Sequence, residues 1–126
     1  PPFNPHHVIS AMADELKAYD IRRVIGDNYA AEFTASAFNA NGISYSKSDK
    51  NKNAIYAELL PRLCSGEIEL LDDERLVSQI ASLERRTRSG GRDIIDHPPG
   101  GHDDLANAVA GVAVVAATQR RMVGAL

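Results

Sequence analysis

The stretch Gly100–Val109, which reads GGHDDLANAV, places two adjacent carboxylates directly before a run of small and apolar residues. Asp103 and Asp104 would lie at a helix N-terminus, where free N–H groups and the helix dipole favour acidic side chains. Capping therefore explains one of the two acids in a helix of any function. The helix is predicted from residue 103 or 104 to about residue 121, close-packed on a sheet by an apolar stripe of Leu105, Ala108, Val109, Val112, Val115 and Ala116.

Strand signals alternate with helix signals along the rest of the chain. Helices are expected at residues 5–20, 30–39, 54–63 and 74–84, and strands at residues 22–26, 43–46, 67–71 and 93–96. The last of these strands reads as the second arm of an irregular hairpin. This alternation predicts an α/β fold with at least partly parallel strand pairing, in a single domain of residues 1–126.

Composition narrows the class of protein. The chain has 126 residues, of which 44% are hydrophobic and 25% charged, as is ordinary for a folded domain. The single cysteine, Cys64, fits a reducing compartment and no zinc site. The longest apolar run, residues 109–117, is far shorter than the roughly 20 residues of a membrane span, so we expect a soluble, cytoplasmic protein without a membrane partner.

A second acid resembles the pair at the last helix. Asp27 follows the apolar segment Val24-Ile25-Gly26, and ligands of open α/β sheets bind at the carboxyl ends of strands. An acid at a strand end and an acid on the first turn of a packed helix can converge from distant parts of the sequence. Such carboxylates repel one another unless a cation lies between them, and Mg²⁺ or Mn²⁺ prefers oxygen ligands of this kind.

Basic residues gather in two segments although the net charge is −3. Arginine is planar and bidentate, and glycine lets backbone N–H groups approach an anion, so an arginine-rich glycine loop can clamp a phosphate. A solvated hairpin tip that touches nothing has the same composition, and both interpretations stay open. The first segment carries Lys50 and Lys52, and the second surrounds Ser89-Gly90-Gly91 with Arg85, Arg86, Arg88 and Arg92.

Four segments together carry a resemblance to a known family. In chain order they are VIGDNYAAEF, SKSDKNKNAIYAELLPRL, SGEIELLDDERL and LERRTRSGGRDIIDHPPGGHDDLANAVAG. This succession resembles the C-terminal nuclease domain of the large terminase subunit of tailed bacteriophages, in the RNase H-like superfamily. The resemblance covers nearly the whole chain, from about Asn4 to Ala117.

The resemblance implies an endonuclease that cuts concatemeric double-stranded DNA during genome packaging in the bacterial host cell. Two divalent metals, roughly 3.5–4 Å apart, would be held by a cluster of carboxylates. Asp27 matches the second acid of the family, and Asp103 or Asp104 supplies the last one. The related nucleases carry their helix acid two residues before a leucine and three before an alanine, and this spacing from Leu105 and Ala106 favours Asp103. The helical angle favours Asp104, which lies nearer the edge of the apolar stripe.

The same resemblance implies which proteins the chain binds and which of its residues contact DNA. The terminase ATPase domain, the small terminase subunit and the portal would be the protein partners. The DNA contacts would come from Lys50, Lys52, Arg85, Arg86, Arg88, Arg92 and His102. Three other features read as structural: Tyr56 packs, His97 precedes a proline pair, and residues 72–74 are helix-start acids.

The chain departs from the family pattern at its start. The fold of the family opens with a hairpin and a third strand, and the first catalytic acid lies on the first strand, whereas only Pro1-Pro2-Phe3 precede Asn4 here. We therefore expect a nuclease domain truncated at its N-terminus, which binds metal weakly and cuts DNA poorly by itself. Two alternatives remain: a non-catalytic DNA-binding or assembly module from a prophage remnant, and a Holliday-junction resolvase-like nuclease.

Overall fold

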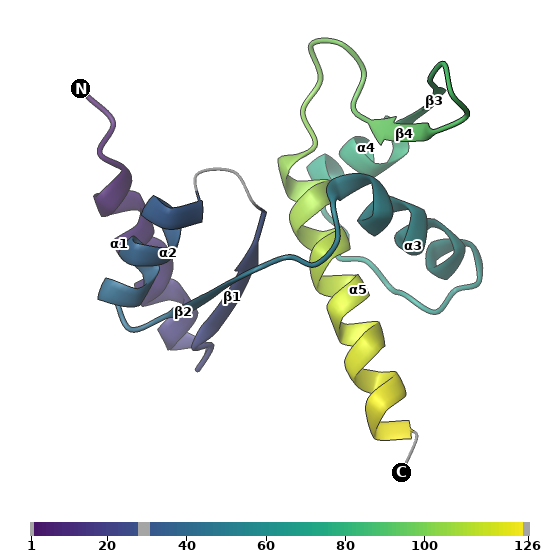
Figure 1. The fold of residues 1–126 in the computed structure, drawn as a ribbon. Coiled ribbons are helices and arrows are strands. Elements are labelled where there is room, and N and C mark those ends of the chain that lie inside the picture. The colour runs from purple at the N-terminus through teal and green to yellow at the C-terminus, as the bar shows by residue number, and fades with distance from the viewer. Residues whose placement is uncertain (1, 28–30, 125–126) are drawn as a thin grey trace. The chain divides into compact units, whose positions relative to one another are not determined.

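The computed structural model describes residues 2–27 and 31–124, without the side chains of residues 31 and 121–124. The chain divides into two compact units, Pro1–Asp49 and Lys50–Leu126, and each is described by itself (Figure 1). The single domain of residues 1–126 stays a prediction. No helix in the described part of the chain is long and apolar enough to span a bilayer.

The first unit is a parallel strand pair covered by two helices. Its elements are α1 (Pro5–Ala18), β1 (Arg23–Gly26), α2 (Ala31–Ala40) and β2 (Ser44–Lys47). The strands pair in parallel from Arg23↔Ser44 to Gly26↔Lys47, with α2 as the crossover. Figure 1 shows both helices on one side of this pair. Their contacts with it bury a core of Ile9, Ala13, Ala37, Phe38 and Ile43.

The second unit is built around the last helix. Its elements are α3 (Lys52–Cys64), α4 (Glu74–Ala81), β3 (Glu84–Thr87), β4 (Asp93–Asp96) and α5 (Asp104–Gly124). Strands β3 and β4 form the predicted hairpin, with Glu84 opposite Asp96. The core contains Tyr56 and Leu59 of α3 against Ala106 and Ala110 of α5, and Ile95 of β4 packs on it. Because alanine side chains are short, α5 lies close to α3.

The predicted starts of two helices, at residues 5 and 74, are confirmed, whereas the third helix begins at Lys52 instead of residue 54. The Asn4 side chain accepts a hydrogen bond of 3.0 Å from the N–H of His6 and begins α1. The Asp73 carboxylate accepts one of 2.8 Å from the N–H of Leu76 and begins α4. Each cap satisfies a backbone donor that has no partner inside its helix.

Three predictions about packing are wrong. The described residues form a parallel pair and a separate antiparallel pair instead of one mixed sheet flanked by helices. Residues 67–71 form no strand, because no described strand pairs with them. Leu71, the last residue of this segment, is 76% exposed. Helix α5 packs on α3 and α4, and its buried face is Ala106, Ala110 and Val114, whereas Val112 of the predicted stripe is 70% exposed.

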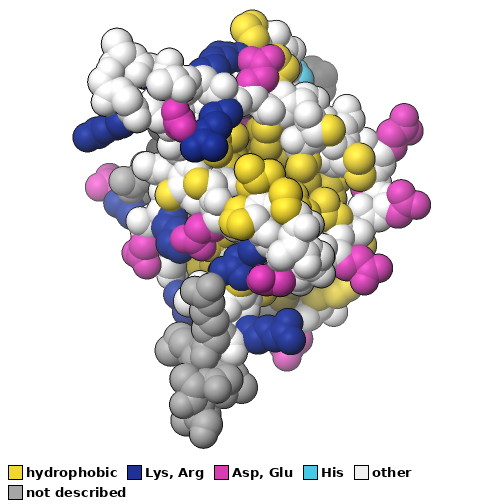
Figure 2. Space-filling model, turned by 90° about the vertical axis from the view of Figure 1, so that its right-hand side faces the viewer, with side chains coloured by type: hydrophobic (Ala, Val, Ile, Leu, Met, Phe, Trp, Pro, Cys, Tyr) yellow, Lys and Arg dark blue, Asp and Glu magenta, His cyan; other side chains and the backbone are white. Residues whose placement is uncertain are grey.

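One face of the molecule carries exposed apolar side chains. Figure 2 shows hydrophobic side chains gathered in the middle of this face, with acidic and basic side chains around them. Basic and acidic side chains are interspersed on this face (Figure 2).

Candidate metal centre

Asp103 lies directly before α5, and its carboxylate is turned into the second unit. The Asp103 carbonyl accepts the first helical hydrogen bond, 2.7 Å from the N–H of Asn107. Its side chain is buried, and Oδ2 accepts a hydrogen bond of 2.8 Å from the Tyr56 hydroxyl. Asp104 follows as the first residue of the helix and is exposed. The two adjacent acids therefore differ in burial: Asp103 is buried and Asp104 is exposed.

The side-chain cap of α5 comes from another helix. Oε1 of Gln79, on α4, accepts hydrogen bonds of 2.9 Å from the N–H groups of both Leu105 and Ala106. Gln79 is itself 8% exposed, so these bonds are shielded from water. The sequence-based prediction gave this role to one of the two aspartates. Because Gln79 fills it, the Asp103 carboxylate is available for other contacts.

Two further residues bring ligand atoms next to Asp103. Asp96 and His97 follow each other at the end of β4, and their ligand atoms and those of Asp103 all lie within 4.8 Å of one another. Oδ1 of Asp96 lies 3.7 Å from Nε2 of His97 and accepts a hydrogen bond of 2.9 Å from the His97 N–H. Lys52 joins the group from the start of α3, with Nζ 2.5 Å from Asp96 and 3.1 Å from Asp103.

The charges of this group shift its proton equilibria. Burial lowers the pKa of Lys52, but its hydrogen bonds to Asp96 and Asp103 outweigh burial and leave that pKa raised. The hydrogen bond from Lys52 lowers the pKa of Asp96 against a smaller effect of burial. Burial, and then the hydrogen bond to Asp103, raise the pKa of the Tyr56 hydroxyl. Tyr56 is therefore a donor to Asp103 throughout the physiological pH range.

The donor set fits a divalent metal. Two carboxylates and one imidazole combine the oxygen ligands of Mg²⁺ and Mn²⁺ with a nitrogen ligand that Mn²⁺ and Co²⁺ accept readily. A hydrogen bond to a ligating carboxylate from outside the metal shell, as Tyr56 makes to Asp103, holds the carboxylate in orientation. We refer to Asp96, His97 and Asp103 as the acidic triad.

The acids predicted from the sequence as metal ligands lie in different surroundings. Asp103 lies in the acidic triad, and Asp104 is the exposed neighbour. Asp27 is exposed at the carboxyl end of β1, where its backbone carbonyl accepts a hydrogen bond of 2.9 Å from the Tyr45 hydroxyl. Since Asp27 belongs to the first unit, its sharing of a metal with Asp103 or Asp104 stays a prediction. Sequence reasoning missed Asp96, although an acid that ends an apolar strand is the same signal that singled out Asp27.

The predicted DNA-binding residues divide into paired and unpaired groups. Arg85 pairs with Asp93 at 2.6 Å and Arg86 with Glu84 at 2.7 Å, while Lys50 pairs with Glu58. At the hairpin tip, the N–H of Arg88 donates to the carbonyl of Arg92 across 3.0 Å. Within the described residues, the side chains of these two arginines form no ion pair. They are therefore the arginines of the loop that are available to a phosphate.

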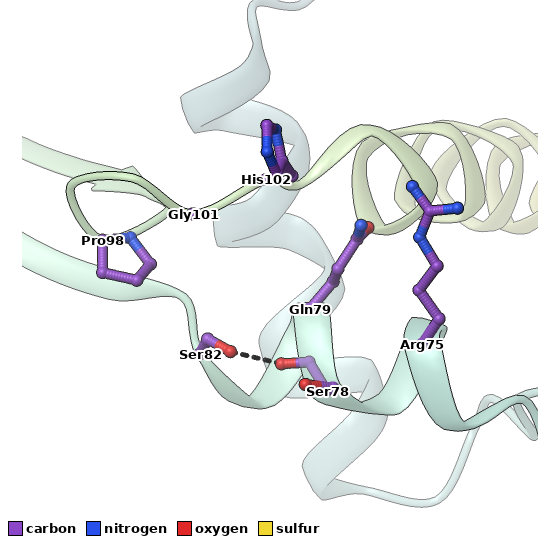
Figure 3. Close-up of a pocket in the computed structure, with 7 residues that line it drawn as sticks. All are labelled: Arg75, Ser78, Gln79, Ser82, Pro98, Gly101 and His102. Carbon is purple, nitrogen blue, oxygen red and sulfur yellow. Dashed lines mark hydrogen bonds between the residues drawn. The ribbon is translucent and has the colours of Figure 1, made fainter.

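A hollow of about 280 Å³ lies beside the start of α5 (Figure 3). Arg75 and Gln79 extend from α4 towards the start of α5, and His102 comes from the segment before that helix. None of the residues that line the hollow carries a carboxylate, and most of them have side chains that donate hydrogen bonds; they are Arg75, Ser78, Gln79, Ser82, Pro98, Gly101 and His102. His102, predicted to contact DNA, thus lies near an arginine that sequence reasoning did not select.

Comparison with known proteins gives a similarity of fold. No protein-family model matches the sequence, and no curated protein matches it. The structure is similar to the crystal structure of the large terminase nuclease from thermophilic phage G20c, with a TM-score of 0.73 and 16% sequence identity. The match covers 86% of this chain and 61% of that one. The crystal structure of the same nuclease with bound cobalt gives a TM-score of 0.72 at 16% identity, covering 86% of this chain and 60% of that one.

This similarity confirms the predicted resemblance to the terminase nuclease at the level of the fold. The chain spans about 61% of the G20c nuclease. At 16% identity, the similarity concerns backbone arrangement, and the chemistry of the site has to be argued from the residues of this chain.

Proposed function

We propose that this chain is a metal-dependent DNA endonuclease domain of the terminase large-subunit type. The observation that carries the proposal is the buried Asp103 carboxylate, grouped with Asp96 and His97 on a fold similar to a nuclease that has been crystallised with cobalt. Concatemeric double-stranded DNA would be the substrate. The ATPase domain, the small terminase subunit and the portal would be the partners during packaging.

The residues of the acidic triad would divide the work of metal binding. Asp103 and Asp96 would provide carboxylate ligands and His97 a nitrogen ligand, while Tyr56 fixes the orientation of Asp103. A bound Mg²⁺ or Mn²⁺ supplies Lewis acidity that activates water and stabilises the leaving oxygen at phosphorus. Asp27 is the proposed acid of the first unit, and the exposed Asp104 is the weaker candidate beside Asp103. Arg88, Arg92 and His102 would hold the DNA backbone.

One observation favours a second candidate function. Lys52 already lies between Asp96 and Asp103, so these carboxylates are compensated by a cation that belongs to the chain itself. A structural role for this group would suit a non-catalytic DNA-binding or assembly module. Binding of a divalent metal distinguishes the two functions.

The experiment is a Mn²⁺ titration by calorimetry, together with nicking of supercoiled plasmid. We expect the chain to bind Mn²⁺ and to nick plasmid slowly in its presence and not in EDTA. Asp103→Asn should abolish both, because it removes the buried carboxylate charge. Asp72→Asn is the matched control, since Asp72 is an exposed acid outside the triad. Asp104→Asn, compared with Asp103→Asn, determines which of the adjacent acids is the ligand.

Two outcomes decide between the functions. Mn²⁺ binding that is unchanged in both Asp103→Asn and Asp96→Asn would contradict the proposed metal centre. Binding of duplex DNA by the same preparation, with no dependence on divalent ions, would then establish the non-catalytic module.

A further inference from the structure

Lys52 places an ammonium group where a metal ion would be expected. It is the first residue of α3, and its Nζ atom contacts Oδ1 of Asp96 at 2.5 Å and Oδ2 of Asp103 at 3.1 Å. Both oxygen-bearing groups belong to the acidic triad. The side chain of Asp103 is only 9% exposed, and a buried carboxylate requires a compensating charge. The Lys52 ammonium supplies that charge.

We propose that Lys52 is a built-in competitor of the metal, and that metal binding transfers its ammonium from the carboxylates to a DNA phosphate. This inference rests on the proposed metal centre and adds a coupling between the metal and DNA. Before metal binds, the ammonium keeps Asp96 and Asp103 together. A divalent ion held by the carboxylates would repel the positive charge of Lys52.

The chemistry of lysine suits such an exchange. Its ammonium is a compact point charge on a flexible four-carbon stem, and it binds a phosphate as well as a carboxylate. The Lys52 side chain is 37% exposed, so its end can reach water without unfolding of α3. The Tyr56 hydroxyl donates to Oδ2 of Asp103, the same oxygen that Lys52 contacts, so this carboxylate keeps one donor when the ammonium leaves.

Two consequences separate this competition from a purely structural ion pair. Removal of the ammonium should leave two carboxylates facing each other without a cation, so the metal-free protein loses stability. The same change should make metal binding tighter, because the metal no longer displaces a resident charge. A lysine that only supports the fold would give the first effect without the second.

The test compares Lys52→Met with Lys50→Met in the full chain. Lys50 lies two residues earlier and pairs with Glu58, outside the triad, which makes it a matched control. We expect Lys52→Met to raise the Mn²⁺ affinity about ten-fold, a size typical of coupling between two ligands, and Lys50→Met to leave it unchanged. The unfolding temperature of Lys52→Met should fall in EDTA and return to the wild-type value in Mn²⁺.

The DNA arm of the test uses a blunt duplex and Ca²⁺. Lys52→Met should weaken duplex binding in Ca²⁺, where the wild-type ammonium is released to phosphate, and not in EDTA. Lys50→Met should have equal effects in both conditions. If Lys52→Met does not fold, Lys52→Gln gives the same comparison with a neutral side chain that can still donate hydrogen bonds.

The outcomes separate this inference from the proposed function. Unchanged or weaker Mn²⁺ binding by a folded Lys52→Met protein, with wild-type binding intact, overturns the competition and leaves the metal centre standing. Absence of Mn²⁺ binding in both the wild type and the variant overturns the metal centre and the competition together. Binding by the variant alone supports the competition in its strongest form.

Discussion

The Tyr56 hydroxyl donates a hydrogen bond of 2.8 Å to Oδ2 of Asp103, and so ties the core of the second unit to its candidate metal ligand. Tyr56 is 2% exposed, which places this bond in an environment of low dielectric constant. The residue was predicted only to pack. It does pack, against Leu59, Ala106 and Ala110, and in addition it orients the carboxylate.

Tyr56→Phe should therefore affect both stability and metal binding. A hydrogen bond to a charged group contributes about 1.5–3 kcal/mol, and loss of a group that orients a metal ligand weakens metal binding about ten-fold or more. Urea unfolding and Mn²⁺ calorimetry measure the two effects. Tyr19→Phe is the control, since the Tyr19 side chain is exposed and lies outside the acidic triad, and it should leave Mn²⁺ affinity unchanged.

Gln79→Met should destabilise α5 from a distance. The change keeps the length of the side chain but leaves the N–H groups of Leu105 and Ala106 without their acceptor. We expect a loss on the order of 1–3 kcal/mol in the free energy of unfolding. Gln119→Met, at an exposed position of α5, should change it little. Equal losses in the two variants would show that the cap contributes nothing.

The unpaired arginines should carry the salt-dependent part of DNA binding. We expect the double change Arg88→Gln/Arg92→Gln to weaken duplex binding and to reduce the slope of log K against log salt by about 2, one for each phosphate contact. Fluorescence anisotropy at several salt concentrations measures this. Arg22→Gln/Arg23→Gln removes the same charge from the first unit, and an identical change of slope there would mean that the hairpin has no special part.

Gly26 allows Tyr45 to lie against the backbone beside Asp27. A Cβ atom at position 26 would fall 2.2 Å from the Tyr45 hydroxyl oxygen, which is too close for any atom. Gly26→Ala should destabilise the chain by about 1–3 kcal/mol, as overpacking does. Gly111→Ala meets nothing within 4 Å in α5 and should be neutral or stabilising. Thermal unfolding of the two alanine variants provides the comparison.

Acid should weaken the β3–β4 hairpin through Asp93. Hydrogen bonds from Thr87 and then Arg85 hold the pKa of this carboxyl below its usual range. Because the pKa of Asp93 is lower in the folded state, its ionised carboxylate stabilises the folded hairpin at pH values above the unfolded pKa of about 3.9. This stabilisation is lost as the pH falls through the pKa of the folded state. NMR of the hairpin between pH 5 and pH 2 should show wild-type signals weakening over this window. In Asp93→Asn that dependence should be absent, and in Asp72→Asn it should persist.

Local features of the fold could be predicted from the sequence because their causes are local. Asn4 and Asp73 start helices through hydrogen bonds to donors two and three residues away, and these spacings are visible in the sequence. The parallel pair β1–β2 also followed, since a helix separates the two strands. The prediction of a strand at residues 67–71 is wrong, because a segment with an alternating pattern forms a strand only where it can make backbone hydrogen bonds to another strand.

The candidate site could be predicted only in part. The helical angle favoured Asp104, but Asp103 precedes the helix and is directed to Tyr56 by contacts outside α5. Asp96 and His97 were missed because the turn at Pro98–Gly101, closed by a 2.8 Å hydrogen bond between these two residues, brings the end of β4 back to the start of α5. That proximity depends on tertiary structure.

The cap that Gln79 provides also bears on how this protein can evolve. An acid that both starts a helix and serves a reaction cannot be lost without damage to the fold. Here the acceptor at the start of α5 is Gln79, whereas the candidate metal ligand is Asp103, so the two roles belong to different residues. A change at position 103 would therefore remove the hydrogen bond from Tyr56 and the ion pair with Lys52, but it would leave the start of α5 capped.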